Sequence, residues 1–201
     1  MKKKKILSLR PSQLAMSLLE VEIKTKEYKK MSPKKLKKTL SEEPVPVVQA
    51  PNGDLYLIDN HHKTCALWMA GVKSVYVKVV YRFPKSVSYR EFWRRMIKNH
   101  WAHPFDTRGN GPVDSLYFPK DIRGIGNDPY RTLAWLCRQH GGYKNSKKTF
   151  AEFKWANYFR KKRLLKSSYL TDFRLGLKKA LVAARHPDAR RLPGYMGKDE
   201  I

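Results

Sequence analysis

Residues 55–71 constrain the fold of this chain more than any other stretch. The short apolar run Leu55–Ile58 leads straight into the polar group Asp-Asn-His-His-Lys at positions 59–63. From Thr64 onward the apolar side chains recur at the spacing of one helical face, and Gly71 stands where many helices end in a left-handed residue. We therefore predict a strand that turns directly into a helix at the polar group.

The start of such a helix suits an anion, because its first N–H groups and the positive end of its dipole point at whatever lies in front of it. Lys63 and Thr64 would add a cation and a hydroxyl donor there, and Asn60 would contribute from the turn. We expect these three residues to bind a phosphate. The plainer alternative is that the polar group only satisfies the free backbone groups where the strand ends and the helix begins.

Asp59, His61 and His62 are the first candidates for catalysis, because carboxylates and imidazoles can move protons. Asp59 is also a candidate ligand for a divalent metal such as Mg²⁺. Neighbouring helical positions point in different directions, so the two histidines are not expected to share one ion. We expect one ring to face the anion and the other to anchor the turn.

Several further segments extend the pattern over nearly the whole chain. They are Leu9-Arg-Pro-Ser-Gln13, Glu20-Val21, Asn127-Asp-Pro-Tyr-Arg-Thr-Leu-Ala134, Glu152-Phe-Lys-Trp-Ala156 and Leu192-Pro-Gly-Tyr195. With residues 59–63 they resemble the putative ParB-like nuclease branch of the ParB/sulfiredoxin-like superfamily. In that superfamily an Asp-Gly-His-His-Arg box, at a strand–turn–helix, grips nucleotide phosphates. Here Asn60 replaces the common Gly and Lys63 replaces Arg, which removes the bidentate fork of a guanidinium group.

The resemblance implies an α+β fold, with a small mixed β-sheet and a helical C-terminal half. It also makes ATP or ADP a candidate ligand of the box, residues 59–63. In kinase members of the superfamily, a Glu from the N-terminal region is taken to act as a base near the box, and Glu20 is similar in position. Such a carboxylate could accept a proton or help to hold Mg²⁺. Glu22 is a nearby competitor, and pairing of Glu20 with local lysines is an equally good interpretation.

The charge of the chain points to a polyanionic partner. The sequence has 43 Lys and Arg against 17 Asp and Glu, a formal net charge of +26, and a pI near 10.2. Basic residues are concentrated in residues 1–40 and 160–191. We expect nucleic acid, DNA in particular, to contact Lys34, Lys35, Lys37, Lys38, Arg160, Lys161, Lys162 and Arg163. A lysine-rich surface that serves only solubility is the alternative.

Local signals divide the chain into an α+β core over residues 1–84 and a helical extension over residues 85–201, packed together as one compact unit. Ser32-Pro33 is typical of a helix start, and Asn52-Gly53 of a hairpin turn. Val45–Gln49 has strand character, and its Pro46 favours either an edge strand or a place among the first residues of the strand. Val75–Tyr81 alternates as a strand.

In the extension, Asp128-Pro129 predicts a helix start, and Thr149-Phe-Ala-Glu152 has the spacing of a capping box. Arg131 could line a nucleotide pocket or brace the two halves through a salt bridge, and bracing is the favoured interpretation. Trp155 and its aromatic neighbours at helical spacing are more typical of a core than of a base-stacking platform.

The chain has no apolar run of about 18 residues and therefore no expected membrane span. The apolar segment after the N-terminal lysines is too short for a signal peptide, so we expect a cytoplasmic protein. Cys65 and Cys137 are expected to be buried free thiols.

Charge and resemblance together favour a DNA nuclease that hydrolyses phosphodiesters at the box. Two-metal hydrolysis uses several carboxylates, and only Asp59, Glu20 and Asp54 are evident candidates. Two alternatives therefore stay open. One is an ATP- or ADP-dependent phosphotransferase, and the other is a non-enzymatic DNA-binding protein switched by nucleotide.

Overall fold

The computed structural model describes residues 2–166 and 173–197. The chain divides into two compact units, Met1–Asn127 and Asp128–Ile201. The break therefore falls after Asn127 and not after Pro84, where the change from sheet to helix signals had placed it. The α+β class predicted from the sequence is confirmed.

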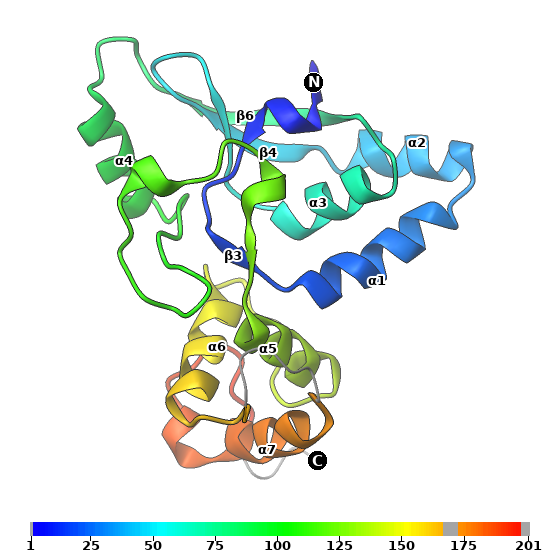
Figure 1. The fold of residues 1–201 in the computed structure, drawn as a ribbon, viewed down its shortest axis with the longest axis vertical. Coiled ribbons are helices and arrows are strands. Elements are labelled where there is room, and N and C mark those ends of the chain that lie inside the picture. The colour runs from blue at the N-terminus through cyan, green and yellow to red at the C-terminus, as the bar shows by residue number, and fades with distance from the viewer. Residues whose placement is uncertain (1, 167–172, 198–201) are drawn as a thin grey trace. The chain divides into compact units, whose positions relative to one another are not determined.

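The N-terminal unit is built on a mixed sheet with the strand order β1-β6-β4-β5-β2 (Figure 1). The strands are β1 (Lys2–Lys5), β2 (Leu9–Arg10), β4 (Val45–Gln49), β5 (Leu55–Leu57) and β6 (Ser74–Arg82). Pairs β1–β6 and β4–β5 are antiparallel, whereas β4–β6 and β2–β5 are parallel.

Alternate residues along the strands face two separate apolar clusters. On one face, Leu55 and Leu57 pack with the helices α1 (Leu18–Lys29) and α3 (His61–Met69), and α2 (Pro33–Glu42) adds partly buried leucines. On the other face, Tyr56 packs with the aromatic side chains of α4 (Tyr89–Lys98). This second cluster explains why α4 belongs to the N-terminal unit.

Shorter elements complete this unit. Strand β3 (Ala15–Met16) pairs in parallel with β7 (Gly126–Asn127), so the last residues of the unit return to its N-terminal part. The 3₁₀ helices are η1 (Ile6–Ser8), η2 (Ser115–Tyr117) and η3 (Ile122–Gly124).

The position of Pro46 agrees with one of the two expected alternatives. β4 lies between β6 and β5 and is not an edge strand, but Pro46 is among its first residues. The sheet tolerates it because the ladder with β5 begins only at Val47, and the carbonyl of Pro46 still accepts a hydrogen bond from Ile58 N–H at 3.2 Å. The N–H that Pro46 lacks therefore lies beyond the end of the β4–β5 ladder, although Pro46 is in register with Lys78 of β6.

The C-terminal unit is helical, with α5 (Pro129–Gln139), α6 (Ala151–Lys161), α7 (Phe173–Arg185) and η4 (Pro187–Ala189). Trp155 and Phe159 are fully buried in its core, and Trp155 stacks on Tyr143 with a centroid distance of 4.3 Å. Trp155 and Phe159 therefore belong to the core and are closed to a base, whereas Tyr158 on the same helix is only partly buried.

The local helix signals were right at two starts and wrong at a third. Ser32 caps α2, and Asp128 caps α5 through Tyr130 N–H. The helix α6 instead begins after Phe150, a left-handed residue that makes no side-chain cap. Glu152 is drawn away from the expected capping box by two arginines described below.

Cys65 and Cys137 are free and buried, as expected. Burial raises their thiol pKa to about 11 and about 12, respectively. Within residues 2–166 and 173–197, no helix combines the length and apolar character that crossing a membrane requires.

Candidate functional site at the start of α3

The turn between β5 and α3 depends on one unusual backbone conformation. Asn60 is the N-cap of α3 and has φ 62° and ψ 27°, in the left-handed region, and its side chain makes no capping bond. Glycine adopts this conformation freely, and Asn tolerates it better than most other residues. Asn60 therefore adopts the left-handed backbone conformation that suits the Gly common at this position of the box.

Both histidines of the box hold the segment that leads from β2 to α1. The Nε2 atom of His61 accepts a hydrogen bond from Ser12 N–H at 3.2 Å, and that of His62 accepts one from Ser17 N–H at 3.0 Å. We had expected only one ring to anchor the turn, but both serve as anchors. Because Nε2 of His61 accepts the bond from Ser12 N–H, the neutral His61 ring carries its proton on Nδ1.

His61 is only 4% exposed, and burial lowers its pKa to about 3. This ring is therefore neutral near pH 7. A ring that is buried, neutral and used as an acceptor has a structural role, and it is a poor donor for catalysis.

The structure brings Glu20 and His62 together. Glu20 lies in the first turn of α1, with its side chain 7% exposed, and its Oε2 is 3.5 Å from Nε2 of His62. The other oxygen, Oε1, is 2.7 Å from the ammonium of Lys24. Among the described residues, Oε2 has no hydrogen-bond donor. A buried carboxylate oxygen without a donor is unfavourable on its own, and such groups are often reserved for a ligand or a proton.

The start of α1 also shows a signal that our sequence interpretation missed. Ser17 caps α1, because its hydroxyl accepts a hydrogen bond from Glu20 N–H at 3.2 Å. Ser17 and Glu20 have the Ser-x-x-Glu spacing of a helix start. That spacing could have predicted where α1 begins and that Glu20 lies in its first turn.

The remaining box residues and Thr64 are less available to bind a phosphate than the sequence had led us to expect. Asp59 is exposed, and its Oδ1 accepts a hydrogen bond from Asn60 N–H at 2.6 Å. Lys63 is only 7% exposed, and its ammonium donates to the carboxylate of Glu43 at 2.6 Å and to the Glu43 carbonyl at 2.9 Å. Thr64 is fully buried, and its hydroxyl has no partner among the described residues.

Lys63 turns toward Glu43 for two reasons. Most residues of α3 are buried, and Glu43, the C-cap of α2, lies close to Lys63. The free carbonyl groups and negative dipole of a helix C-terminus attract a cation, and the Glu43 carboxylate adds a full charge. Lys63 thus links α3 to the end of α2 and does not point a free ammonium at the box.

The donor set does not fit a protein cage for a metal ion. In the part of the chain that the structure describes, no three His, Cys, Asp or Glu side chains come together to hold one. Asp59 therefore does not belong to such a group among the described residues. Mg²⁺ that arrives with a nucleotide, held mainly by phosphates, needs only one or two carboxylates.

Arg131 belongs to the C-terminal unit, where it braces two helices. Its Nη1 donates to Oε2 of Glu152, and Arg138 Nε donates to the other Glu152 oxygen at 2.8 Å, so α5 and α6 are joined. Burial raises the pKa of Glu152, but the two guanidinium groups outweigh it and the pKa ends below its ordinary value. Arg131 therefore forms a bracing ion pair, but it joins α5 to α6 within the C-terminal unit and not, as we had expected, the two halves of the chain.

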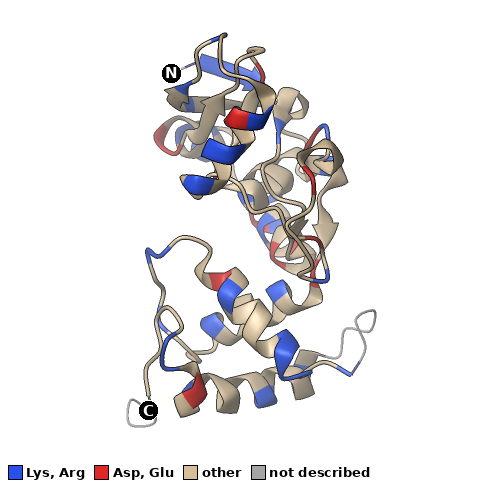
Figure 2. Ribbon diagram, turned by 90° about the vertical axis from the view of Figure 1, so that its left-hand side faces the viewer, with Lys and Arg blue, Asp and Glu red and all other residues tan. Residues whose placement is uncertain are grey.

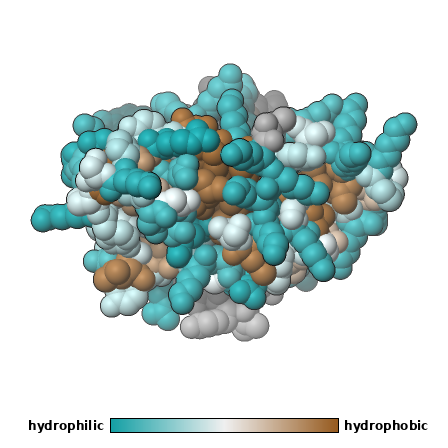
Figure 3. Space-filling model, turned by 90° about the horizontal axis from the view of Figure 1, so that it is seen from above, coloured by the Kyte–Doolittle hydropathy of each residue, from teal (hydrophilic) through white to brown (hydrophobic). Residues whose placement is uncertain are grey.

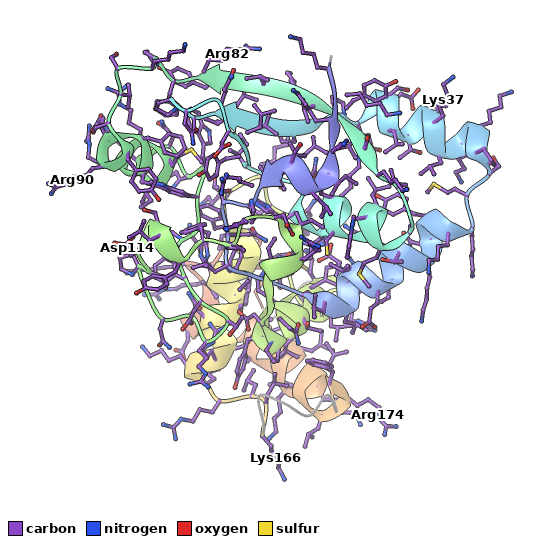
Figure 4. The ribbon with its side chains drawn as sticks, turned by 45° about the horizontal axis from the view of Figure 1, so that its top comes forward. Lys37, Arg82, Arg90, Asp114, Lys166 and Arg174 are labelled. Carbon is purple, nitrogen blue, oxygen red and sulfur yellow. The ribbon has the colours of Figure 1, made fainter. Side chains whose placement is uncertain are left out.

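The predicted nucleic-acid-binding residues differ between the two units. All four lysines of the α2 cluster, Lys34, Lys35, Lys37 and Lys38, are exposed. Figure 4 shows Lys37 extending away from the helix. At the end of α6, Arg160 is paired with Asp128 at 2.6 Å and Lys162 with Asp188 at 3.1 Å, whereas Lys161 and Arg163 are exposed. The α2 cluster is therefore the better candidate surface.

Basic side chains are not confined to one place. Lys and Arg occur on the helices of both units (Figure 2), and the four lysines of β1 are all exposed. Seen from above, the molecule is mostly hydrophilic, with long polar side chains lying around smaller hydrophobic areas (Figure 3).

Comparisons with known proteins agree with this architecture. The family model described as putative ParB-like nuclease matches residues 2–161. No curated protein matches the chain. A crystal structure of protein Atu1540 from Agrobacterium tumefaciens is similar, with 34% sequence identity, a TM-score of 0.87, and coverage of 98% of each chain. With its fold, its box and this match over most of its length, the chain belongs to the putative ParB-like nuclease family.

Proposed function

We propose that the chain binds nucleic acid, DNA in particular, and hydrolyses phosphodiester bonds at the start of α3. The observation that carries this proposal is the buried carboxylate of Glu20, which lies beside His62 with one oxygen free of donors. Membership of the family supports the reaction class.

In the proposed reaction, the free oxygen of Glu20 accepts a proton from the attacking water as the water oxygen bonds to phosphorus. The bond to the leaving oxygen then breaks, and that oxygen takes a proton from solvent. The first N–H groups of α3 face the phosphate and stabilise its negative charge. His62 positions the segment before α1, and with it Glu20, through its bond to Ser17 N–H.

The charge of the chain supports a polyanionic substrate. The net charge of +26 leaves most cations without acidic partners, and the exposed α2 cluster is available to phosphates. Its one ion pair among the described residues joins Lys38 to Glu42 at a long 3.7 Å. Binding through such contacts should weaken steeply as salt concentration rises.

A second candidate function is supported by the scarcity of metal-binding carboxylates around the box. Transfer of a phosphoryl group from ATP, or binding of ATP or ADP as a switch, needs fewer of them than two-metal hydrolysis does. In this case Glu20 would accept the proton of an acceptor hydroxyl, and Mg²⁺ would arrive with the nucleotide phosphates.

The deciding experiment compares Glu20→Gln with Glu22→Gln. Glu22 lies on the same helix but is exposed, so it is a matched control. Plasmid cleavage is measured with Mg²⁺ and with EDTA, and salt-dependent DNA binding is measured in parallel. We expect the cleavage rate of Glu20→Gln to fall by about 10²- to 10⁴-fold while DNA binding persists. Glu22→Gln should cleave and bind DNA as the wild-type protein does.

Unchanged cleavage in Glu20→Gln would remove this residue as the base. Absence of cleavage in the unchanged protein, together with calorimetric binding of ADP or ATP, would favour the second function. Absence of DNA binding even at low salt would refute the charge argument.

A further inference from the structure

A cavity of about 300 Å³ lies in the N-terminal unit, away from the box. It opens between the hairpin turn after β4 and the segment that leads from β6 into α4. Its lining residues are Ala50, Pro51, Asn52, Tyr56, Lys85, Val87, Tyr89 and Phe92. Tyr56 belongs to the cluster on the α4 face of the sheet, whereas its neighbours Leu55 and Leu57 face α1 and α3. The cavity and α3 therefore lie on opposite faces of the sheet.

Aromatic side chains form a rigid base for this cavity. Tyr56 and Phe92 are 7% and 1% exposed, and their ring centroids are 5.2 Å apart at 52°. Burial raises the pKa of the Tyr56 hydroxyl to about 12, so it stays protonated. The cavity thus offers an aromatic surface built by two neutral, largely buried rings.

Tyr89 is different, because this large aromatic side chain is 52% exposed. Its ring lies 6.3 Å from that of Trp93, so one part of it rests on the core while the rest stays open to a ligand. An aromatic side chain that is half exposed beside a cavity is suited to stacking on a planar group.

One cationic side chain lines the cavity, and two arginines lie on the elements that flank it. Lys85 is one of its lining residues and is exposed, and Figure 4 shows Arg82 and Arg90 extending outward from β6 and α4. The nearby carboxylates already have cationic partners, since Asp54 is paired with Arg10 at 2.6 Å and Glu91 binds two arginines of α4. The cations beside the cavity are therefore available to an anionic ligand.

We propose that this cavity binds one unpaired base of a single-stranded nucleic acid. The base stacks against Tyr89 above Tyr56 and Phe92, and an adjoining phosphate contacts Lys85. Aromatic surface together with a cation fits a nucleotide better than a purely apolar ligand, which would gain nothing from the charge. This inference rests on the nucleic-acid binding proposed above and identifies single strands as a preferred form.

The test measures fluorescence anisotropy of the full chain with labelled oligothymidylate, oligouridylate and a hairpin duplex of matched length. Stacking on an aromatic side chain contributes enough that Tyr89→Ala should weaken single-strand binding by at least about 5-fold, with little effect on the duplex. Tyr89→Phe should retain binding, because the ring remains. Tyr117→Ala is the matched control, since Tyr117 is 75% exposed but lies outside the cavity.

Lys85→Ala should also weaken single-strand binding and reduce its dependence on salt. Lys98→Ala is the control for the loss of one positive charge, because Lys98 is exposed on the last turn of α4. It should reduce single-strand binding less than Lys85→Ala does. Comparison of the two oligonucleotides distinguishes DNA from RNA as the source of the base.

Equal single-strand binding by Tyr89→Ala and the unchanged protein would overturn the cavity proposal while nucleic-acid binding stands. If the wild-type protein binds the duplex but neither single strand, the cavity proposal is likewise overturned and nucleic-acid binding stands. If the unchanged protein binds none of the three, both the cavity proposal and the proposed function fail.

Discussion

His61 should make the stability of this protein depend on pH in a way that one substitution removes. In the folded chain burial lowers the pKa of His61 to about 3, whereas an unfolded histidine titrates near 6.5. The unfolded state therefore binds the extra proton first as the pH falls. The stability that depends on a neutral ring is complete above about pH 6.5 and is lost progressively between about pH 6.5 and pH 3.

The size of the effect at pH 5 follows from the unfolded pKa, because the folded pKa lies well below that pH. Between pH 8 and pH 5, protonation of the unfolded ring lowers the free energy of unfolding by about 2 kcal/mol. His61→Gln removes the titrating group and keeps an oxygen that can accept from Ser12 N–H. The substitution is expected to lower stability at pH 8, since the ring is tightly packed.

The assay is urea unfolding, followed by intrinsic fluorescence, at a series of pH values from 8 to 5. The difference in unfolding free energy between the unchanged protein and His61→Gln should shrink by about 2 kcal/mol over this range. His140→Gln, the same substitution at an exposed position, is the matched control. A difference for His61→Gln that does not vary with pH would refute the conclusion that this ring is held neutral by burial.

Two further substitutions test the backbone and the C-terminal unit. Asn60→Gly should change the free energy of unfolding by a few tenths of a kcal/mol at most. Asn60→Val should lower it by about 1–2 kcal/mol, because a β-branched side chain opposes the left-handed conformation. Equal effects of the two substitutions in urea unfolding would contradict this. Glu152→Ala should lower the free energy of unfolding by about 3–5 kcal/mol, because it leaves the cation of Arg131 buried without its partner. Replacing both Arg131 and Glu152 by Met should recover part of this loss in thermal unfolding, and a double variant as unstable as the single one would count against the bracing role.

Local sequence patterns were sufficient for much of the framework. The strand–turn–helix around residues 55–71, the turn at Asn52-Gly53 and the helix starts at Ser32 and Asp128 were all predicted. Each of these depends on backbone preferences of residues that are neighbours in the chain, which is why spacing alone can reveal them. The position of Glu20 beside the box came from family resemblance and agrees with its contact to His62.

Tertiary structure decided which groups meet. His61 binds a residue 49 positions away, and Lys63 binds Glu43, 20 positions away. The inner position of Pro46, and the diversion of Glu152 from the expected capping box, likewise depend on strands and helices that are distant in the chain. Local spacing sets the direction of a backbone segment, but a buried polar group takes the partner that packing brings near, because leaving it unpaired is unfavourable. The sequence alone thus determined the strand–turn–helix of residues 55–71 and the location of the box, and only the tertiary structure decided that both histidines and Lys63 hold the fold while Glu20 keeps a free carboxylate oxygen.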